Sequence, residues 1–276
     1  MKIGFCTALN EERIHFASSA TFDGIEISVS PGSPLDPASV TDDDIQQAKD
    51  LLEEEGVEAL TVFHYEDYAS QDPDRAKTAR ANVSRAMDIA ESLNTPIVCC
   101  NAWVSGEDDA AKLKSFAAIF GDIAKLAEDR GFQIAIENCP HGGRNIAWSP
   151  AMWERMFDAI PSESLGLEYD PSHLVWEGID PIAPIREFAS RIYAFHAKDT
   201  EILTPVLRRE GILGRGWWRA RIPGWGEIDW KAIFGALADI RYDGDIIIEH
   251  EDPVFSDERF EEGLRLGLRH LRKYMP

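Results

Sequence analysis

The stretch QIAIENCP, residues 133–140, contains an apolar run that ends in the carboxylate Glu137. Such a run bounded by polar residues is typical of a buried β-strand. Burial of an unpaired carboxylate costs several kcal/mol. We therefore expect Glu137 to be paired, bound to a metal ion, or placed at a strand end that faces solvent.

Seven further runs of this kind flank the stretch. The eight candidate strands are residues 2–8, 24–29, 58–65, 96–103, 133–138, 165–170, 192–198 and 245–251. Amphipathic helical patterns separate them, for example residues 41–56, which start at a capping residue, Thr41, and stop at Gly56. Residues 74–94 and 108–131 follow the same pattern.

Eight β-then-α units in 276 residues predict an α/β protein with a (β/α)8 TIM barrel, since such barrels typically need about 250 residues. We expect one domain spanning residues 1–276, with a long active-site loop at 199–226. The structural alternative is a doubly wound open sheet. It is disfavoured because no G-x-G-x-x-G pattern follows the first strand.

Composition excludes several classes of protein. The chain carries 49 acidic and 28 basic residues, a net charge of −21, which repels phosphate backbones and argues against nucleic acid as a partner. No apolar run approaches the roughly 18 residues of a membrane span, and the first residues contain no secretory apolar segment. We expect a cytoplasmic protein that does not bind membranes. The four cysteines form no C-x-x-C pair, so reduced thiols are expected.

Four polar residues end the last four strands of the predicted barrel: Glu137, Asp170, His196 and Glu249. Active sites of such barrels lie where the carboxyl ends of the strands meet, so all four can point into one mouth. Three carboxylates would repel one another there unless a cation is bound. Oxygen ligands with one imidazole favour a divalent ion, with Mn first and Mg, Co or Zn as alternatives.

The motifs IENCP, DPSH, FHAKD, PGWGEIDW and IIIEHED resemble the xylose isomerase-like TIM-barrel superfamily of sugar isomerases and epimerases, over essentially the whole chain. In epimerases similar to tagatose 3-epimerase, a Glu, an Asp, a His and a Glu on strands five to eight hold the metal. The resemblance assigns these roles to Glu137, Asp170, His196 and Glu249. It also makes His173, three residues after the metal Asp, a substrate contact and a catalytic candidate.

The activity implied by the resemblance is isomerisation or epimerisation of a ketose or keto-sugar derivative through a metal-stabilised enediolate, with Glu137 and Glu249 as proton shuttles. A lyase or dehydratase acting on a keto-inositol or 3-keto-glycoside, C-glycosides included, would use the same first step. Two other classes are weaker. The endonuclease branch of the superfamily needs a basic DNA face, and a non-catalytic sugar-binding barrel would not need four intact ligands.

Further substrate contacts are expected around the same mouth. His64 and Trp103 end the third and fourth predicted strands, and Arg144 follows Glu137 on a rim segment. The epimerases carry a substrate Arg soon after the metal His, which is absent here, so Arg219 or Arg221 is a candidate replacement. Lys198 is a candidate too, with Asp199 as its ion-pair partner. The aromatic residues of the long loop suit a lid or a subunit contact, which leaves a homo-oligomer open.

Overall fold

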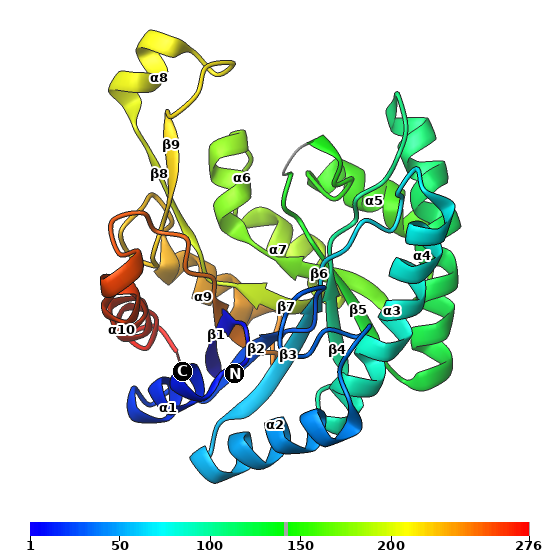
Figure 1. Ribbon diagram of the computed structural model, residues 1–276. Helices are drawn as coiled ribbons and strands as arrows, with labels where there is room; N and C mark the ends of the chain where they lie inside the picture. The colour runs from blue at the N-terminus through cyan, green and yellow to red at the C-terminus, as the bar shows by residue number, and fades with distance from the viewer. Residues whose placement is uncertain (141–142, 276) are drawn as a thin grey trace.

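The computed structural model describes residues 1–140 and 143–275, and it contains a closed barrel of eight parallel strands (Figure 1). The strands run in the order β1-β10-β7-β6-β5-β4-β3-β2 around the barrel. Their bounds are β1 Ile3–Thr7, β2 Gly24–Ser28, β3 Glu58–His64, β4 Ile97–Cys100, β5 Gln133–Glu137, β6 Leu165–Tyr169, β7 Ile192–His196 and β10 Ile246–Ile248. The predicted TIM barrel is confirmed, and each strand falls within its predicted run.

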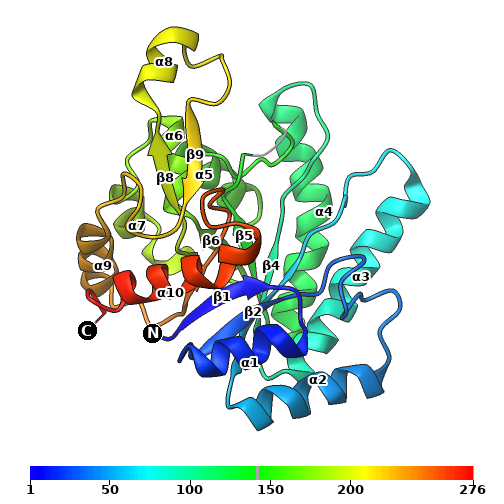
Figure 2. The same ribbon diagram turned by 60° about the vertical axis from the view of Figure 1, so that its left-hand side comes forward.

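Helices cover the outside of this barrel, and their ends follow the capping signals in the sequence. Thr41 forms a capping box with Asp44, and Gly56 ends the same helix in the left-handed conformation at φ 65°. The helices are α1 Glu11–Ser19, α2 Asp42–Glu55, α3 Pro73–Ser92, α4 Asp109–Arg130, α5 Pro150–Ala159, α6 Pro171–Glu177, α7 Ala183–Glu187, α9 Trp230–Asp239 and α10 Phe260–Leu271. Figure 2 shows α1, α2 and α10 on the side that carries β1 and β2.

The apolar core has two parts. The larger part lies between the strands and the surrounding helices and includes Phe5, Phe120 and Trp153. The smaller part fills the inside of the barrel with Cys99, Ala135 and Ala194. Above it the interior becomes polar, which is the arrangement that places a functional site at one end of a TIM barrel.

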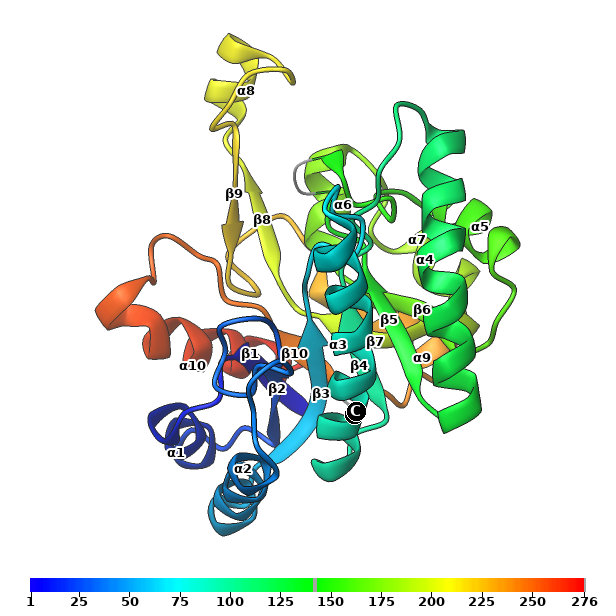
Figure 3. The same ribbon diagram turned by 45° about the vertical axis from the view of Figure 1, so that its right-hand side comes forward.

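The long loop predicted at 199–226 contains regular structure of its own. Strands β8 Asp199–Ile202 and β9 Trp218–Arg221 form an antiparallel hairpin, and the short helix α8 Thr204–Glu210 lies at its far end. Figures 1 and 3 both show this hairpin standing away from the barrel at the end where the active site is expected.

A β-bulge in β3 changes which side chains face the inside of the barrel. The pairing of β2 with β3 shifts after Ile25, from Ile25 opposite Ala59 to Glu26 opposite Thr61. Leu60 lies against Gly4 and Gly24, while Thr61 donates to Glu26 inside the barrel. One extra residue inverts every later side chain on the strand, so Phe63 faces inward and His64 outward.

No helix in the two described segments, 1–140 and 143–275, is long and apolar enough to cross a bilayer.

Candidate active site

A cavity of about 290 Å³ opens at the carboxyl ends of the barrel strands. Its lining combines acidic, aromatic and amide side chains: Cys6, Phe63, Tyr65, Asn101, Trp103, Glu137, Cys139, Asn145, His196, Lys198, Glu249 and Glu251. Three of the four predicted metal ligands are in this set, and the fourth, Asp170, is fully buried beside them. The structure therefore brings all four together.

Asp170 is held by its own backbone and by the helix that it starts. The side-chain amide of Asn138 donates to the carbonyl of Asp170 at 2.9 Å and accepts from its N–H at 2.6 Å. Oδ1 of Asp170 accepts from the N–H of Ser172 at 2.7 Å and so caps α6. Oδ2 has no hydrogen-bond partner among the described residues, although it is buried. Oδ1 therefore stabilises the start of α6, and Oδ2 points at the site.

The two carboxylate oxygens of Glu137 also have different partners. Its Oε2 accepts from the hydroxyl of Tyr65 at 2.9 Å, and its backbone carbonyl accepts from the amide of Asn145. Its Oε1 lies 3.4 Å from Nδ1 of His196 and 3.8 Å from Nε2 of His173. Despite the opposing effect of burial, the nearby His173, His196 and Lys198 hold the pKa of Glu137 well below its usual value. Glu137 is therefore ionised.

His196 is oriented from below by two buried carboxylates. Its Nε2 lies 2.8 Å from Glu26 and 3.0 Å from Glu168. Its Nδ1 lies 3.4 Å from Glu137 and 3.3 Å from Glu249. Burial opposes a second proton, but Glu168, Glu26 and Glu249 outweigh burial and raise the pKa of His196 well above its usual value, so both ring nitrogens carry protons without an ion. A bound cation would displace the proton on Nδ1, while the buried carboxylates keep the one on Nε2, as in the carboxylate–histidine pairs that support metal sites.

Glu26 and Glu168 were missed by the sequence analysis, although each is a charge within an apolar strand, as Glu137 is. Burial and the adjacent Glu26 raise the pKa of Glu168 to about 8. Glu26 stays ionised, because His196, Glu168 and Thr61 together lower its pKa against the effect of burial. One proton is thus retained between the two carboxyl groups at neutral pH.

Lys198 brings the only ammonium group to the lining of this cavity within the described chain. Its Nζ lies 3.1 Å from Asp170 Oδ2, 3.1 Å from Glu251, 3.2 Å from His173 Nε2, and in contact with Glu249. Burial lowers the pKa of Lys198, but these carboxylates outweigh burial and raise it well above its usual value. Lys198 therefore places a permanent positive charge beside two predicted metal ligands.

Asp199 does not pair with Lys198. Its carboxylate accepts from the backbone of Gly224 and Ile228 and from the indole of Trp230, at 2.9 to 3.1 Å. The expected ion pair between these neighbours is replaced by two separate roles. Lys198 serves the cavity, and Asp199 fixes the base of the β8–β9 hairpin.

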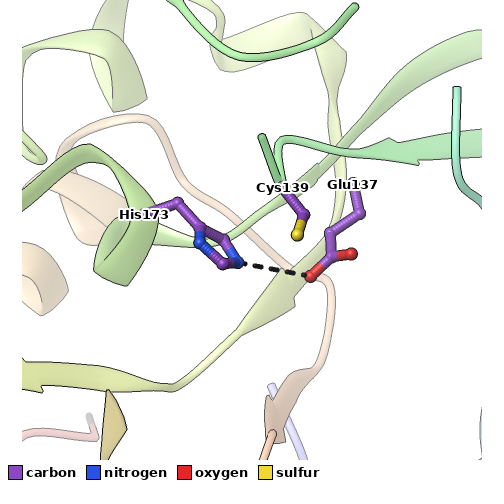
Figure 4. A group of neighbouring side chains, drawn as sticks. All are labelled: Glu137, Cys139 and His173. Atoms are coloured by element: carbon purple, nitrogen blue, oxygen red, sulfur yellow. Dashed lines mark ion pairs between the residues drawn. The ribbon is translucent and has the colours of Figure 1, made fainter. Parts of the chain in front are cut away.

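His173 and Cys139 lie on the same side of the site (Figure 4). The imidazole is buried, with Nε2 3.4 Å from Asp170 Oδ2 and Nδ1 3.4 Å from the indole nitrogen of Trp176. Donor atoms of Glu137, Asp170, His173 and Glu249 lie within 4.8 Å of one another, and those of Glu137, Cys139 and His173 form a second such group. His173 thus stands where a ligand to the ion, or to a molecule bound beside it, would stand.

The other predicted substrate contacts divide into two groups. Trp103 lines the cavity, and Arg144 lies 5.6 Å above its ring while pairing with Asp67 at 2.6 Å. Arg221 is buried outside the cavity lining, beside Glu201 and Asp252.

His64 also lies outside the cavity lining. It is fully buried, with Nδ1 2.9 Å from the carbonyl of Val29 and Nε2 3.2 Å from Glu66. The bulge in β3 explains its orientation, and Phe63 and Tyr65 take the positions on the cavity.

The donor set fits a divalent ion. Carboxylate oxygens from Glu137, Asp170 and Glu249 converge with imidazole nitrogen, the mixture that suits Mn, Mg, Co or Zn. Two buried donor atoms, Asp170 Oδ2 and His196 Nδ1, make no hydrogen bond within the described residues, and Asp170 Oδ2 has the ion pair with Lys198 at 3.1 Å instead. A bound cation would satisfy both.

Comparison with known proteins identifies the class. A family model described as "Xylose isomerase-like TIM barrel" matches residues 14–274, so the chain belongs to that family.

Several individual proteins are similar to this chain in sequence. The chain is 30% identical over 162 residues to the Bacillus subtilis protein YfiH, covering 55% of this chain and 50% of that protein. It is 28% identical over 192 residues to an inosose dehydratase of Clostridium beijerinckii, covering 68% of this chain and 60% of the relative. A ketose 3-epimerase of Arthrobacter globiformis is 25% identical over 238 residues, covering 83% and 73%. The matched part spans half to three fifths of the first two relatives.

Solved structures agree in fold. A D-psicose 3-epimerase from Clostridium cellulolyticum superposes with a TM-score of 0.76 at 18% identity, covering 99% of both chains. A structure named IOLI protein with a binding zinc atom gives 0.78 at 19% identity, covering 100% of this chain and 99% of that one. At these identities the likeness concerns the barrel alone.

Proposed function

We propose that this protein is a divalent-metal-dependent isomerase or epimerase of a ketose or keto-sugar derivative. One observation carries the proposal: Glu137 and Glu249, from strands separated by β6 and β7, both lie within 3.4 Å of His196 Nδ1. Two ionised carboxylates around one predicted cation position can exchange protons with a sugar carbon from two sides. The ketose 3-epimerase among the relatives supports the same reaction class.

Glu137, Asp170, His196 and Glu249 would hold the ion, for which Mn is the first candidate. A divalent ion there would act as a Lewis acid, polarising the sugar carbonyl and so acidifying the neighbouring C–H. Glu137 or Glu249 takes that proton as a carboxylate. The opposite carboxylate, once it has taken a proton from water or from a substrate hydroxyl, would return a proton to the other face and so invert the carbon, and return of a proton to the neighbouring carbon would give an isomer.

The cavity walls suit a sugar. Trp103 offers an apolar face for sugar C–H groups, while Asn101, Asn145 and Lys198 offer donors for hydroxyl oxygens. His173 lies 3.2 Å from Lys198 Nζ and would contact a hydroxyl next to the reacting carbon. Arg144 pairs with Asp67 through one guanidinium nitrogen, and its remaining N–H groups are available to a substrate hydroxyl.

Elimination is the second candidate function. The inosose dehydratase relatives favour it, since removal of water from a keto-inositol begins with the same proton abstraction. The two reactions separate after that step. A hydroxyl or sugar substituent on the next carbon departs in a lyase, whereas a proton returns in an epimerase.

The test is incubation of Mn-loaded protein with a panel of ketoses in D2O, followed by NMR and mass spectrometry. We expect deuterium at the carbon beside the carbonyl and a new epimer or isomer. Glu137→Gln and Glu249→Gln should each lower exchange by at least about a hundredfold. The exposed variant Glu187→Gln, on α7 outside the cavity lining, is the control and should leave it unchanged.

The outcomes separate the candidates. Exchange together with epimer supports the proposal. Release of water or of an aglycone from an inosose or 3-keto-glycoside, without exchange in simple ketoses, supports elimination. Neither reaction with any metal would contradict both.

A further inference from the structure

The two most exposed large apolar side chains among the described residues lie together, at the end of the β8–β9 hairpin. Leu213 is 96% exposed and Ile212 is 75% exposed, whereas the next such residue, Trp225, is 48% exposed. We call residues 203–217 the arm tip. All three ribbon views show it standing away from the barrel (Figures 1 to 3).

Helix α8, within the arm tip, has no buried residue. It is seven residues long and contains Val206 and Leu207, and Ile212 and Leu213 follow its end by two residues. Isolated helices of this length are unstable in water, and most helices in proteins depend on packing of an apolar face. Val206 and Leu207 are half-buried and Trp217 at the base of the arm tip is buried, so the packing of α8 within the described chain is partial.

Contacts at the base of the hairpin oppose folding of the arm tip back onto its own barrel. Asp199 fixes the start of β8 through bonds to Gly224, Ile228 and Trp230. On the other strand, Trp218 stacks on Trp176 of α6, with ring centroids 4.7 Å apart and an angle of 1° between the planes. These contacts fix the orientation of the hairpin relative to the barrel, so that its apolar end points away from the barrel.

Charge indicates what covers the arm tip. Arg208, Arg209 and Arg215 with one glutamate, Glu210, give it a net charge of +2, in a chain whose total is −21. All three arginines are exposed. A basic, apolar projection on an acidic protein is complementary to the body of the same protein.

We propose that the arm tip docks on a second copy of this chain and holds a homodimer together. The contact is reciprocal, each copy placing its arm tip against the acidic body of the other, because closed two-fold assemblies use the same surface twice. Ile212 and Leu213 form the apolar centre, and the arginines form the charged rim. This inference does not depend on the proposed reaction.

The test is the mass in solution, measured by light scattering and sedimentation over a range of concentrations. We expect wild type at twice the chain mass of 30.9 kDa. Ile212→Asn with Leu213→Asn should give the single-chain mass, and Arg208→Glu with Arg209→Glu should raise the dimer dissociation constant at least tenfold. Val254→Asn, which changes a 38% exposed apolar residue outside the arm tip, is the matched control and should stay dimeric.

A second variant separates loss of the dimer from loss of the fold. Replacing residues 204–216 by Asn-Gly closes the hairpin with a two-residue turn between Leu203 and Trp217 and removes no residue of the described core. It should be monomeric, with the circular dichroism and melting behaviour of a folded barrel. A monomeric wild type at every concentration, or dimers that survive both arm-tip changes, would overturn the proposal.

Discussion

The hydroxyl of Tyr65 lies 2.9 Å from Oε2 of Glu137. Tyr65 follows β3 directly, and its hydroxyl also lies 3.1 Å from Oε2 of Glu168. The phenol therefore links a residue on the cavity with the carboxyl groups inside the barrel. It fixes one oxygen of Glu137 and leaves Oε1 directed at His196 and His173.

Removing that hydroxyl should weaken metal binding. In Tyr65→Phe, Oε2 of Glu137 loses its donor and the carboxylate can rotate, so we expect a 10- to 100-fold lower affinity for Mn²⁺, the usual range for residues that orient metal ligands. Isothermal titration calorimetry measures it. Tyr193→Phe, which removes an exposed hydroxyl bonded to the carbonyl of Glu163, is the control. Equal affinity in Tyr65→Phe would contradict the positioning role.

Lys198 should have the opposite effect on the metal. Its ammonium group lies 3.1 Å from Asp170 Oδ2, so a cation bound there is repelled by it. We expect Lys198→Gln to bind Mn²⁺ at least about tenfold more tightly and to melt at a lower temperature without metal, because the clustered carboxylates lose their neutralising charge. Metal should restore the melting temperature. Weaker Mn²⁺ binding by a folded variant would show that Lys198 does not oppose the ion.

Asn138 should contribute both to the free energy of unfolding and to the affinity of the site for Mn²⁺. Its amide satisfies both the N–H and the carbonyl of buried Asp170. Asn138→Ala leaves both groups unpaired, which should cost about 2–4 kcal/mol in urea unfolding without metal, together with a clear loss of Mn²⁺ affinity. In Asn82→Ala one bond to Glu66 is lost, so a smaller cost and normal metal binding are expected. Equal losses in the two variants would refute the special role of Asn138.

Glu177, at the end of α6, should make the fold less stable in alkali. Burial raises the pKa of Glu177 to about 8, and its Oε2 has no hydrogen-bond partner among the described residues. Between its ordinary pKa and about 8, the folded state keeps a proton that the unfolded state has released. The free energy of unfolding therefore falls across that interval as pH rises.

Glu177→Gln should remove this dependence. We expect the variant to gain melting temperature over wild type at pH 8.5 and to gain little at pH 4.5. Thermal melts across this range measure the difference, with the exposed Glu187→Gln as the control. A gain that is the same at every pH would contradict the raised pKa.

The sequence was sufficient for the barrel and for the positions of the proposed ligands. Apolar runs of the right length and strong caps such as Thr41 predicted all eight strands and the helix that follows β2. Glu137 and His196 end their strands, and Asp170 and Glu249 come one residue later, so the topology alone brings them to one mouth.

What the sequence could not show depends on register and on long-range contacts. One extra residue in β3 turns His64 outward and Tyr65 inward, and apolar periodicity contains no signal for a bulge between buried residues. Arg221 pairs with Asp252, a partner that the chain order does not reveal. The segment 199–226 was expected to be a loop, because its glycines and prolines are typical of loops, although it contains the two short strands β8 and β9.

The measurement that tests the central claim most directly is a calorimetric titration of metal-free protein with Mn²⁺, comparing wild type with Asp170→Asn. This substitution keeps the oxygen that caps α6 through Ser172 and replaces the oxygen that faces the site with an amide. We predict one ion per wild-type chain and at least a hundredfold weaker binding in a variant whose circular dichroism shows a folded barrel. A wild type that binds no divalent ion, or a variant that binds it equally well, would contradict the claim that these four strand ends form a metal site.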